Sequence, residues 1–224
     1  MMINNFYYPH LSRQDISAYY KSAGEFYATY NCEKNYSNIS KDCQYRCVYC
    51  DASVDECGGE PFSLDHFRPM DVFLEKFDGI LKTHPFNLHL SCQKCNVLKT
   101  NDWKGCRETQ DGATFVSRLG YIDRFKVDIS NYISVNENGM VVSIDDNGPG
   151  DYMIRKMLLN RTNRVFIRKR RLVKNKAALI LRLLLQKQND LLNSKDLNAE
   201  DFKVEIMKLQ NLFKRFEQLD LIKV

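Results

Sequence analysis

Two Cys-x-x-Cys pairs constrain the fold of this chain more than any other feature. They are Cys47 and Cys50 in "CVYC", and Cys92 and Cys95 in "CQKC". Each pair forms a tight knuckle that aims two thiolates at one point, and two knuckles complete a tetrahedral zinc site with Zn–S bonds of about 2.3 Å. Four thiolates close the coordination shell, so the predicted zinc is structural and does not activate water. The 41 residues between Cys50 and Cys92 are too many for a minimal loop and predict a functional insertion.

The other cysteines do not indicate a secreted disulfide framework. That interpretation fits short chains with a signal peptide, whereas the first residues lack a basic region followed by an apolar one, and the most apolar run, "AALILRLLL", is short and interrupted by Arg182. We therefore expect a cytoplasmic protein without a membrane segment. The remaining cysteines are expected to be small apolar residues, with Cys43 as an alternative zinc ligand: Cys32, Cys43, Cys57 and Cys106.

The rest of the chain predicts helices and one small hairpin. At 224 residues with 44% apolar composition, it can bury a sizeable core. Helical spacing predicts an N-terminal helix from Ser12 to Tyr30, and Asn138-Gly139 between two alternating runs predicts a β-hairpin. Helices are then expected from Asp151 and from about Arg164 to Gln188, the second after a cap at Thr162 or Asn163. A final helix, expected to run antiparallel to the one before it, has apolar residues on one face: Phe202, Ile206, Leu209, Phe213 and Phe216. This organisation suggests three parts, 1–40, 41–110 and 111–224.

The insertion between the knuckles contains two polar motifs. "LDHFRP" (64–69) places an acid, a histidine and an arginine within four positions, and "FNLHLS" (86–91) leads directly into the second knuckle. The ordered series from Arg46 to Trp103 resembles the zinc-stapled branch of the HNH endonuclease family. That resemblance implies an α+β, mainly helical protein around a ββα-metal core, in which a β-hairpin and a helix hold a catalytic divalent metal.

The resemblance also implies a role for each residue of these motifs. His66 would be the general base, since an imidazole can take a proton at neutral pH. Asp65 would bind the catalytic metal, Mg²⁺ or Mn²⁺, and Asn87 would hold the loop that aims the histidine. The third family position falls on Asn96, where many members have histidine; its amide oxygen can bind a hard cation but adds no charge, so the metal would be held modestly.

Basic side chains could hold the phosphates of a nucleic acid. Lys99 lies one helical turn after Asn96, and Arg68 can engage a phosphate through two donors. The stretch 164–176, "RVFIRKRRLVKNK", has no acidic residue, which favours a polyanion or an acidic protein surface as its partner. Backbone phosphates are the simplest target, with Arg168 and Arg171 as candidate contacts. The alternative is a basic face balanced by the acidic residues of the "AEDFKVE" helix.

We therefore predict a metal-dependent endonuclease that hydrolyses DNA. "GYIDRF", the "GPG" loop and "LLNRTNRV" are also similar to HNH proteins of prokaryotic anti-phage systems, of the retron-associated or Septu type, which implies a partner ATPase. Two alternatives remain open at this stage: a non-catalytic, zinc-stapled nucleic-acid-binding or scaffold module, and an HNH nuclease directed at RNA.

Overall fold

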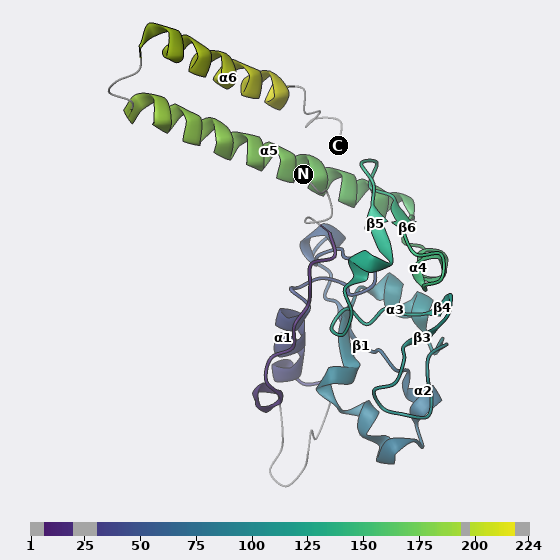
Figure 1. Cartoon of the computed structure of the whole chain (residues 1–224). Coiled ribbons are helices and arrows are strands. Elements are labelled where there is room, and N and C mark those ends of the chain that lie inside the picture. The colour runs from purple at the N-terminus through teal and green to yellow at the C-terminus, as the bar shows by residue number, and fades with distance from the viewer. Residues whose placement is uncertain (1–6, 20–30, 194–197, 218–224) are drawn as a thin grey trace. The chain divides into compact units, whose positions relative to one another are not determined.

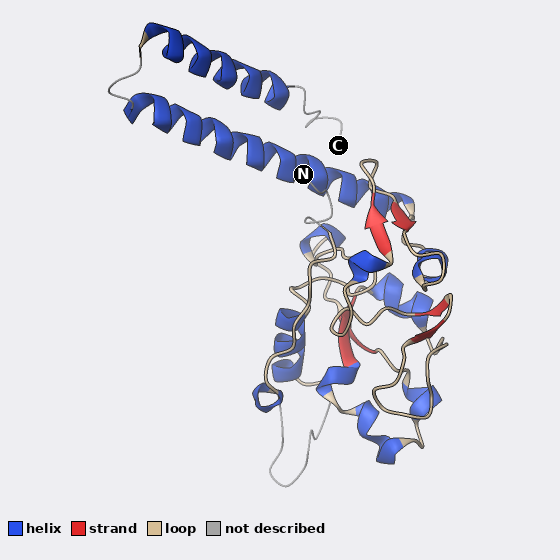
Figure 2. Cartoon of the chain, in the orientation of Figure 1, coloured by secondary structure: helices blue, strands red, loops and turns tan. Residues whose placement is uncertain are grey.

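The computed structural model describes residues 7–19, 31–193 and 198–217. The fold is α+β, and helices make up nearly half of the chain (Figures 1 and 2). The chain divides into two compact units, Met1–Ile167 and Arg168–Val224, and the division falls inside one helix. The boundaries suggested by the sequence, at 40 and 110, both fall inside the first unit.

The regular elements are short in the first unit and long in the second. The α-helices are α1 (Glu33–Asp42), α2 (Met70–Phe73), α3 (Gln93–Lys99), α4 (Gly150–Lys156), α5 (Thr162–Asn193) and α6 (Ala199–Glu217). The strands are β1 (Ser63–His66), β2 (Leu88–Ser91), β3 (Phe115–Val116), β4 (Leu119–Gly120), β5 (Ile133–Val135) and β6 (Val141–Ser143). Short 3₁₀ turns are η2 (Ile16–Ala18), η3 (Asp55–Cys57), η4 (Phe77–Lys82), η5 (Pro85–Asn87) and η6 (Ile129–Asn131).

The hairpin formed by β1 and β2 lies at the centre of the first unit. The strands are antiparallel, with Asp65 opposite His89 and His66 opposite Leu88. Every residue of β2 is buried, because α1 packs against β2 while α3 packs against β1. Helix α3 begins immediately after β2, with Cys92 as its N-terminal cap residue. The two motifs of the insertion are thus brought together by strand pairing.

The N-terminal region differs from the helix predicted over Ser12–Tyr30. Residues 20–30 lie outside the described part, and within 12–19 the only helical element is the 3₁₀ turn η2, whose cap Asp15 accepts a hydrogen bond from the Ser17 amide. Tyr19 is nevertheless buried, and its hydroxyl donates to Asp42. Within residues 12–19, Tyr19 is therefore buried from a segment that is not a continuous α-helix.

The second hairpin agrees with the sequence pattern. β5 and β6 pair antiparallel from Ile133–Ser143 to Val135–Val141, and Gly139 takes a left-handed backbone conformation with φ of 80°, which glycine adopts at little cost. The amide of Asn160 joins the hairpin to the turn after α4, since its Oδ1 accepts from the Val141 amide at 2.7 Å and its Nδ2 donates to the Val141 carbonyl at 2.8 Å.

The second unit is a helical hairpin. α6 returns alongside α5 (Figure 1), and Lys187 of α5 forms an ion pair with Glu205 of α6. The predicted apolar face of α6 is only partly covered, because Phe202 and Phe213 are 48% and 52% exposed. None of the helices in the described residues is long and apolar enough to span a bilayer.

Candidate metal centre and catalytic motif

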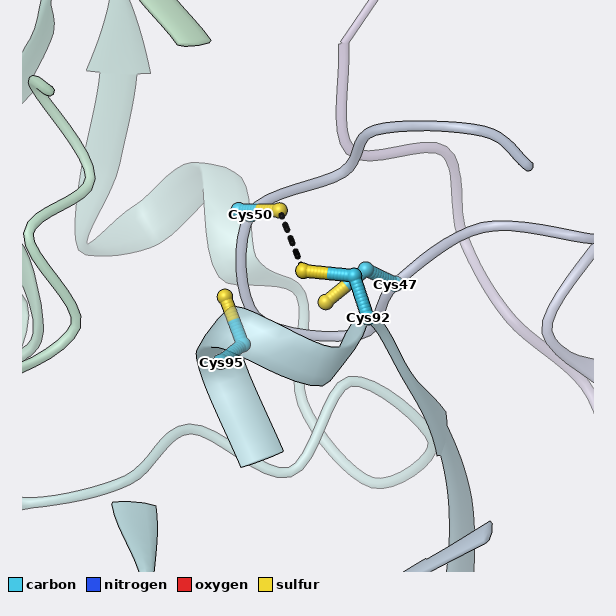
Figure 3. A group of neighbouring side chains, drawn as sticks. All are labelled: Cys47, Cys50, Cys92 and Cys95. Carbon is cyan, nitrogen blue, oxygen red and sulfur yellow. Dashed lines mark hydrogen bonds between the residues drawn. The ribbon is translucent and has the colours of Figure 1, made fainter. Parts of the chain in front are cut away.

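The four cysteines of the two knuckles lie together, as the spacing predicted. The sulfur atoms of Cys47, Cys50, Cys92 and Cys95 are all within 4.8 Å of one another, and all four residues are buried (Figure 3). The Cys50 and Cys92 sulfurs are 3.8 Å apart. Tetrahedral zinc with Zn–S bonds of about 2.3 Å requires an S···S separation of about 3.8 Å, so the cluster is compatible with a structural zinc ion.

Backbone hydrogen bonds hold the two knuckles against each other. In the first knuckle, the Asp51 amide donates to the Cys47 carbonyl at 2.9 Å, which closes the turn. The Val48 amide donates to the Leu90 carbonyl at 3.0 Å, which attaches this knuckle to β2. The second knuckle is the first turn of α3. Hydrogen bonds with Cys47 and then Cys95 lower the pKa of Cys50 to about 7, against the opposing effects of Cys92 and burial.

The other four cysteines are not members of this group, although the Cys57 thiol forms a hydrogen bond with the Cys92 sulfur. Cys43 is buried, and its sulfur accepts a hydrogen bond from the Leu90 amide at 3.4 Å. Burial is the main cause that raises the pKa of this thiol, to about 11, so Cys43 has the character of a core thiol. The remaining three are half-buried: Cys32, Cys57 and Cys106.

Asp65 is buried and paired with a buried lysine. Lys99 Nζ lies 3.3 Å from Asp65 Oδ1 and 3.2 Å from Oδ2, and it donates to the His66 carbonyl at 2.7 Å. The Tyr49 hydroxyl also donates to Asp65 Oδ2. Burial raises the pKa of Asp65, against the opposing effects of Lys99 and Tyr49, and burial lowers the pKa of Lys99. Lys99, predicted to contact phosphate, is fully buried and connects α3 to β1.

His66 is oriented by a backbone carbonyl. Its Nε2 lies 2.8 Å from the Lys82 carbonyl oxygen, which can only accept, so Nε2 carries the proton and Nδ1 is the nitrogen able to take one up. The side chain is half-buried. Burial is the main cause that lowers its pKa, while the Lys82 carbonyl and Asp65 oppose this shift. This lowered pKa favours the neutral form of the imidazole at neutral pH.

Asn87 bridges the two segments that flank this histidine. Its Oδ1 accepts from the Arg68 amide at 2.9 Å, and its Nδ2 donates to the carbonyls of Arg68 at 3.1 Å and Leu81 at 2.8 Å. Leu81 precedes Lys82, whose carbonyl holds His66. The side chain is 5% exposed, so it fixes backbone geometry and does not face solvent.

The remaining residues of the two motifs occupy different environments. Asn96 is half-buried on α3, one turn before Lys99. Arg68 is 4% exposed; its guanidinium donates to the carbonyls of Gln110 and Gly112 and lies over the Trp103 ring. His89 is 1% exposed and stacks on Phe67 with 4.4 Å between ring centroids, and burial lowers its pKa well below the usual value.

The basic stretch of α5 divides into buried and exposed residues. Arg168 and Arg171, the predicted nucleic-acid contacts, are 1% and 8% exposed, whereas Lys169, Arg170 and Lys174 are exposed.

Sequence reasoning also overlooked Lys82. Its side chain is exposed, and its charge contributes to lowering the pKa of His66, so a cation lies near the imidazole. No pattern in the sequence distinguishes this lysine from other loop lysines.

Comparisons of the chain with protein-family models, with curated proteins and with solved structures found no match.

Proposed function

We propose that this protein is a metal-dependent endonuclease of HNH type that hydrolyses phosphodiester bonds of DNA, with His66 as general base. The orientation of His66 carries the proposal. The Nε2–H of this half-buried imidazole is directed at the Lys82 carbonyl, which leaves the ring lone pair on Nδ1, and burial lowers its pKa. Activation of a water molecule requires an imidazole that is neutral and held in a fixed orientation.

Asn87 is proposed as a positioning residue. The Asn87 side chain fixes the peptide groups of Arg68, two residues after His66, and of Leu81, which precedes Lys82. A displacement of the Lys82 carbonyl would rotate the imidazole, and small misplacements of a reacting group cost large factors in rate. The asparagine thus acts through His66 and not on the substrate.

The four-cysteine cluster is proposed to hold structural zinc. The S···S distance of 3.8 Å between Cys50 and Cys92 fits tetrahedral coordination, and the chemistry of four thiolates selects zinc among common cellular cations. The ion would hold together the first knuckle, β2 and α3, and thereby the hairpin that bears Asp65 and His66.

Asp65 and Asn96 are the proposed donors for a catalytic Mg²⁺ or Mn²⁺. Carboxylate and amide oxygens are the ligands these ions prefer, so the two residues fit in chemical kind. A carboxylate offers about four lone-pair positions, and Lys99 and Tyr49 already occupy part of the Asp65 group. Binding would therefore be weak, with water at most positions. When bound, such an ion supplies positive charge against the phosphate and the leaving oxygen.

Exposed cations are the proposed contacts with the nucleic acid backbone. Lys82 lies beside His66, and Lys169, Arg170 and Lys174 form the exposed part of the basic stretch on α5. Such contacts carry no base specificity and weaken with salt. Arg68, Lys99, Arg168 and Arg171 are buried, so we assign them internal roles.

A protein partner is proposed for the second unit. Large apolar side chains remain exposed on both of its helices, including Leu181, Leu185, Leu192, Phe202 and Phe213, and exposed apolar patches commonly mark protein interfaces. This agrees with the resemblance to nucleases of anti-phage systems that work beside an ATPase.

The test is cleavage of supercoiled plasmid by purified protein with Mg²⁺ or Mn²⁺, compared with His66→Ala and with His10→Ala, an exposed histidine outside the motif. We expect nicking by wild type and His10→Ala but not by His66→Ala at equal zinc content. Equal cutting by all three would refute the assignment of the base. Cleavage of RNA alone would change the substrate class, and absence of cleavage of both DNA and RNA by the zinc-loaded protein would favour a scaffold module.

A further inference from the structure

Two arginines reach the four-cysteine cluster from the chain that leads into α5. Arg164, in the first turn of α5, places Nη2 3.5 Å from the Cys92 sulfur and 3.1 Å from the Cys57 sulfur. Arg161, in the turn before α5, places Nη2 3.6 Å from the Cys95 sulfur and 3.9 Å from the Cys92 sulfur. Two of the four knuckle cysteines therefore face guanidinium groups from one short segment.

The charges of this arrangement balance when a metal is present. Four thiolates and one Zn²⁺ carry a net charge of −2, and two guanidinium groups carry +2. Arg164 is 5% exposed, and a buried cation without an anion is strongly unfavourable. With zinc bound, all four sulfurs are thiolates and the group that faces Arg164 carries a net negative charge. The zinc-bound state is thus the one in which the buried arginine is compensated.

Arg161 also holds the turn between α4 and α5. Its Nη1 donates to the carbonyls of Met157 at 3.0 Å and Leu158 at 3.1 Å, which are at the end of α4. Its own carbonyl accepts from the Arg164 amide at 2.9 Å. The segment 157–164 is therefore folded around the Arg161 guanidinium, and the attraction of both guanidinium groups to the thiolates fixes the segment on the cluster.

We infer that Arg161 and Arg164 are positioning residues that neutralise the zinc tetrathiolate, so that zinc retention and the folding of segment 157–164 depend on each other. This inference rests on the zinc site of the proposed function and does not depend on nuclease activity. Groups that donate to metal ligands typically change metal affinity by 10- to 100-fold when they are removed. By linkage, loss of the metal must release the segment to the same extent.

The experiment compares wild type, Arg161→Gln/Arg164→Gln and the control Arg155→Gln. Arg155 lies on α4, with a side chain that is 77% exposed and paired with Asp151. Zinc content is first measured by mass spectrometry, and zinc release to a chromogenic chelator is then followed over time. We expect one zinc per chain in wild type, release at least about tenfold faster from the double variant, and no change in the control.

Two results would overturn the inference in distinguishable ways. A wild-type protein without zinc would refute the zinc site itself, and the arginine role with it. Zinc at one per chain with release from the double variant within about twofold of wild type would refute the arginine role alone. If the double variant does not fold, Arg161→Gln supplies the same comparison, since Arg161 is only half-buried. In wild type, removal of zinc should raise amide exchange over 157–164 more than over α6; an equal change in both would likewise refute the arginine role.

Discussion

Replacing Lys99 by methionine tests the buried pair that joins α3 to β1. Methionine keeps most of the side-chain volume but removes the charge beside Asp65. At 3.2 Å and an effective dielectric constant of about 20, the attraction between the two charges is about 5 kcal/mol. Desolvation offsets part of this in wild type, but a buried carboxylate left without its partner typically costs about 3–5 kcal/mol of folding free energy. We expect a loss of that size at pH 8.

The pH dependence of this loss follows from the pKa of Asp65. Burial already raises this pKa, and removal of Lys99 must raise it further. A carboxyl group with a folded-state pKa above its unfolded value of about 3.9 destabilises the protein as pH rises above that value, because the unfolded state ionises first. The Lys99→Met penalty should therefore be smaller at pH 5 than at pH 8, and Asp65→Asn/Lys99→Met should recover more than half of it.

The assay is urea unfolding of the zinc-loaded protein, followed by the fluorescence of Trp103. This is the single tryptophan of the chain, 2% exposed in the first unit. Lys104→Met is the control, because Lys104 pairs with Asp102 at 3.1 Å but is 44% exposed, and exposed pairs contribute at most about 1 kcal/mol. If Lys99→Met loses no more than Lys104→Met at pH 8, the pair is not buried as described and the reasoning fails.

Three further predictions follow from the site. Asn87→Ala leaves two carbonyls and one amide without this partner and should cost about 2–4 kcal/mol in urea unfolding; a loss below about 1 kcal/mol would contradict the bridging role. Burial lowers the pKa of His66 and His89, so the unfolded state binds more protons than the folded state below about pH 6.5. The free energy of unfolding should therefore fall as the pH decreases from there. His89→Phe should make this fall less steep, and an unaltered slope would contradict the role of His89. Cys92→Ser should abolish zinc binding while Cys43→Ala retains one zinc per chain by mass spectrometry, and loss of zinc from Cys43→Ala would make Cys43 a ligand.

Short sequence patterns predicted the elements that form through interactions between residues close together in the chain. The cysteine spacing was sufficient to predict the four-thiol cluster, because each knuckle is a short-range turn. Asn138-Gly139 predicted the β5–β6 hairpin, and apolar periodicity predicted α4, α5 and α6. Helix α1 was missed for a physical reason: its buried face contains Asn35, Asn38, Ser40 and Asp42 around Ile39, so it lacks the apolar repeat on which sequence analysis depends.

The roles of charged residues could not be predicted in the same way. Lys99 is separated from Asp65 by 34 positions, and Arg68 from its acceptors Gln110 and Gly112 by 42 and 44. No sequence pattern predicts that these partners are in contact in the folded chain. A basic residue in a nuclease-like motif suggests a phosphate contact, but the tertiary fold decides whether the charge reaches solvent. Arg164 illustrates the same point, since its partners are the cysteines of the cluster.

The separation of the knuckles has a consequence for how the chain folds. β1 and β2 are joined by 21 residues, whereas hairpin loops usually have two to five, so the two strands cannot pair as a local event. A link between Cys50 and Cys92 closes a loop of 41 residues and removes chain entropy worth about 4 kcal/mol from the unfolded state. Because the Val48 amide bonds to Leu90 of β2, closing this loop also brings β2 to the first knuckle. We therefore expect zinc capture to precede strand pairing, so that the refolding rate of the first unit is set by the concentration of free zinc.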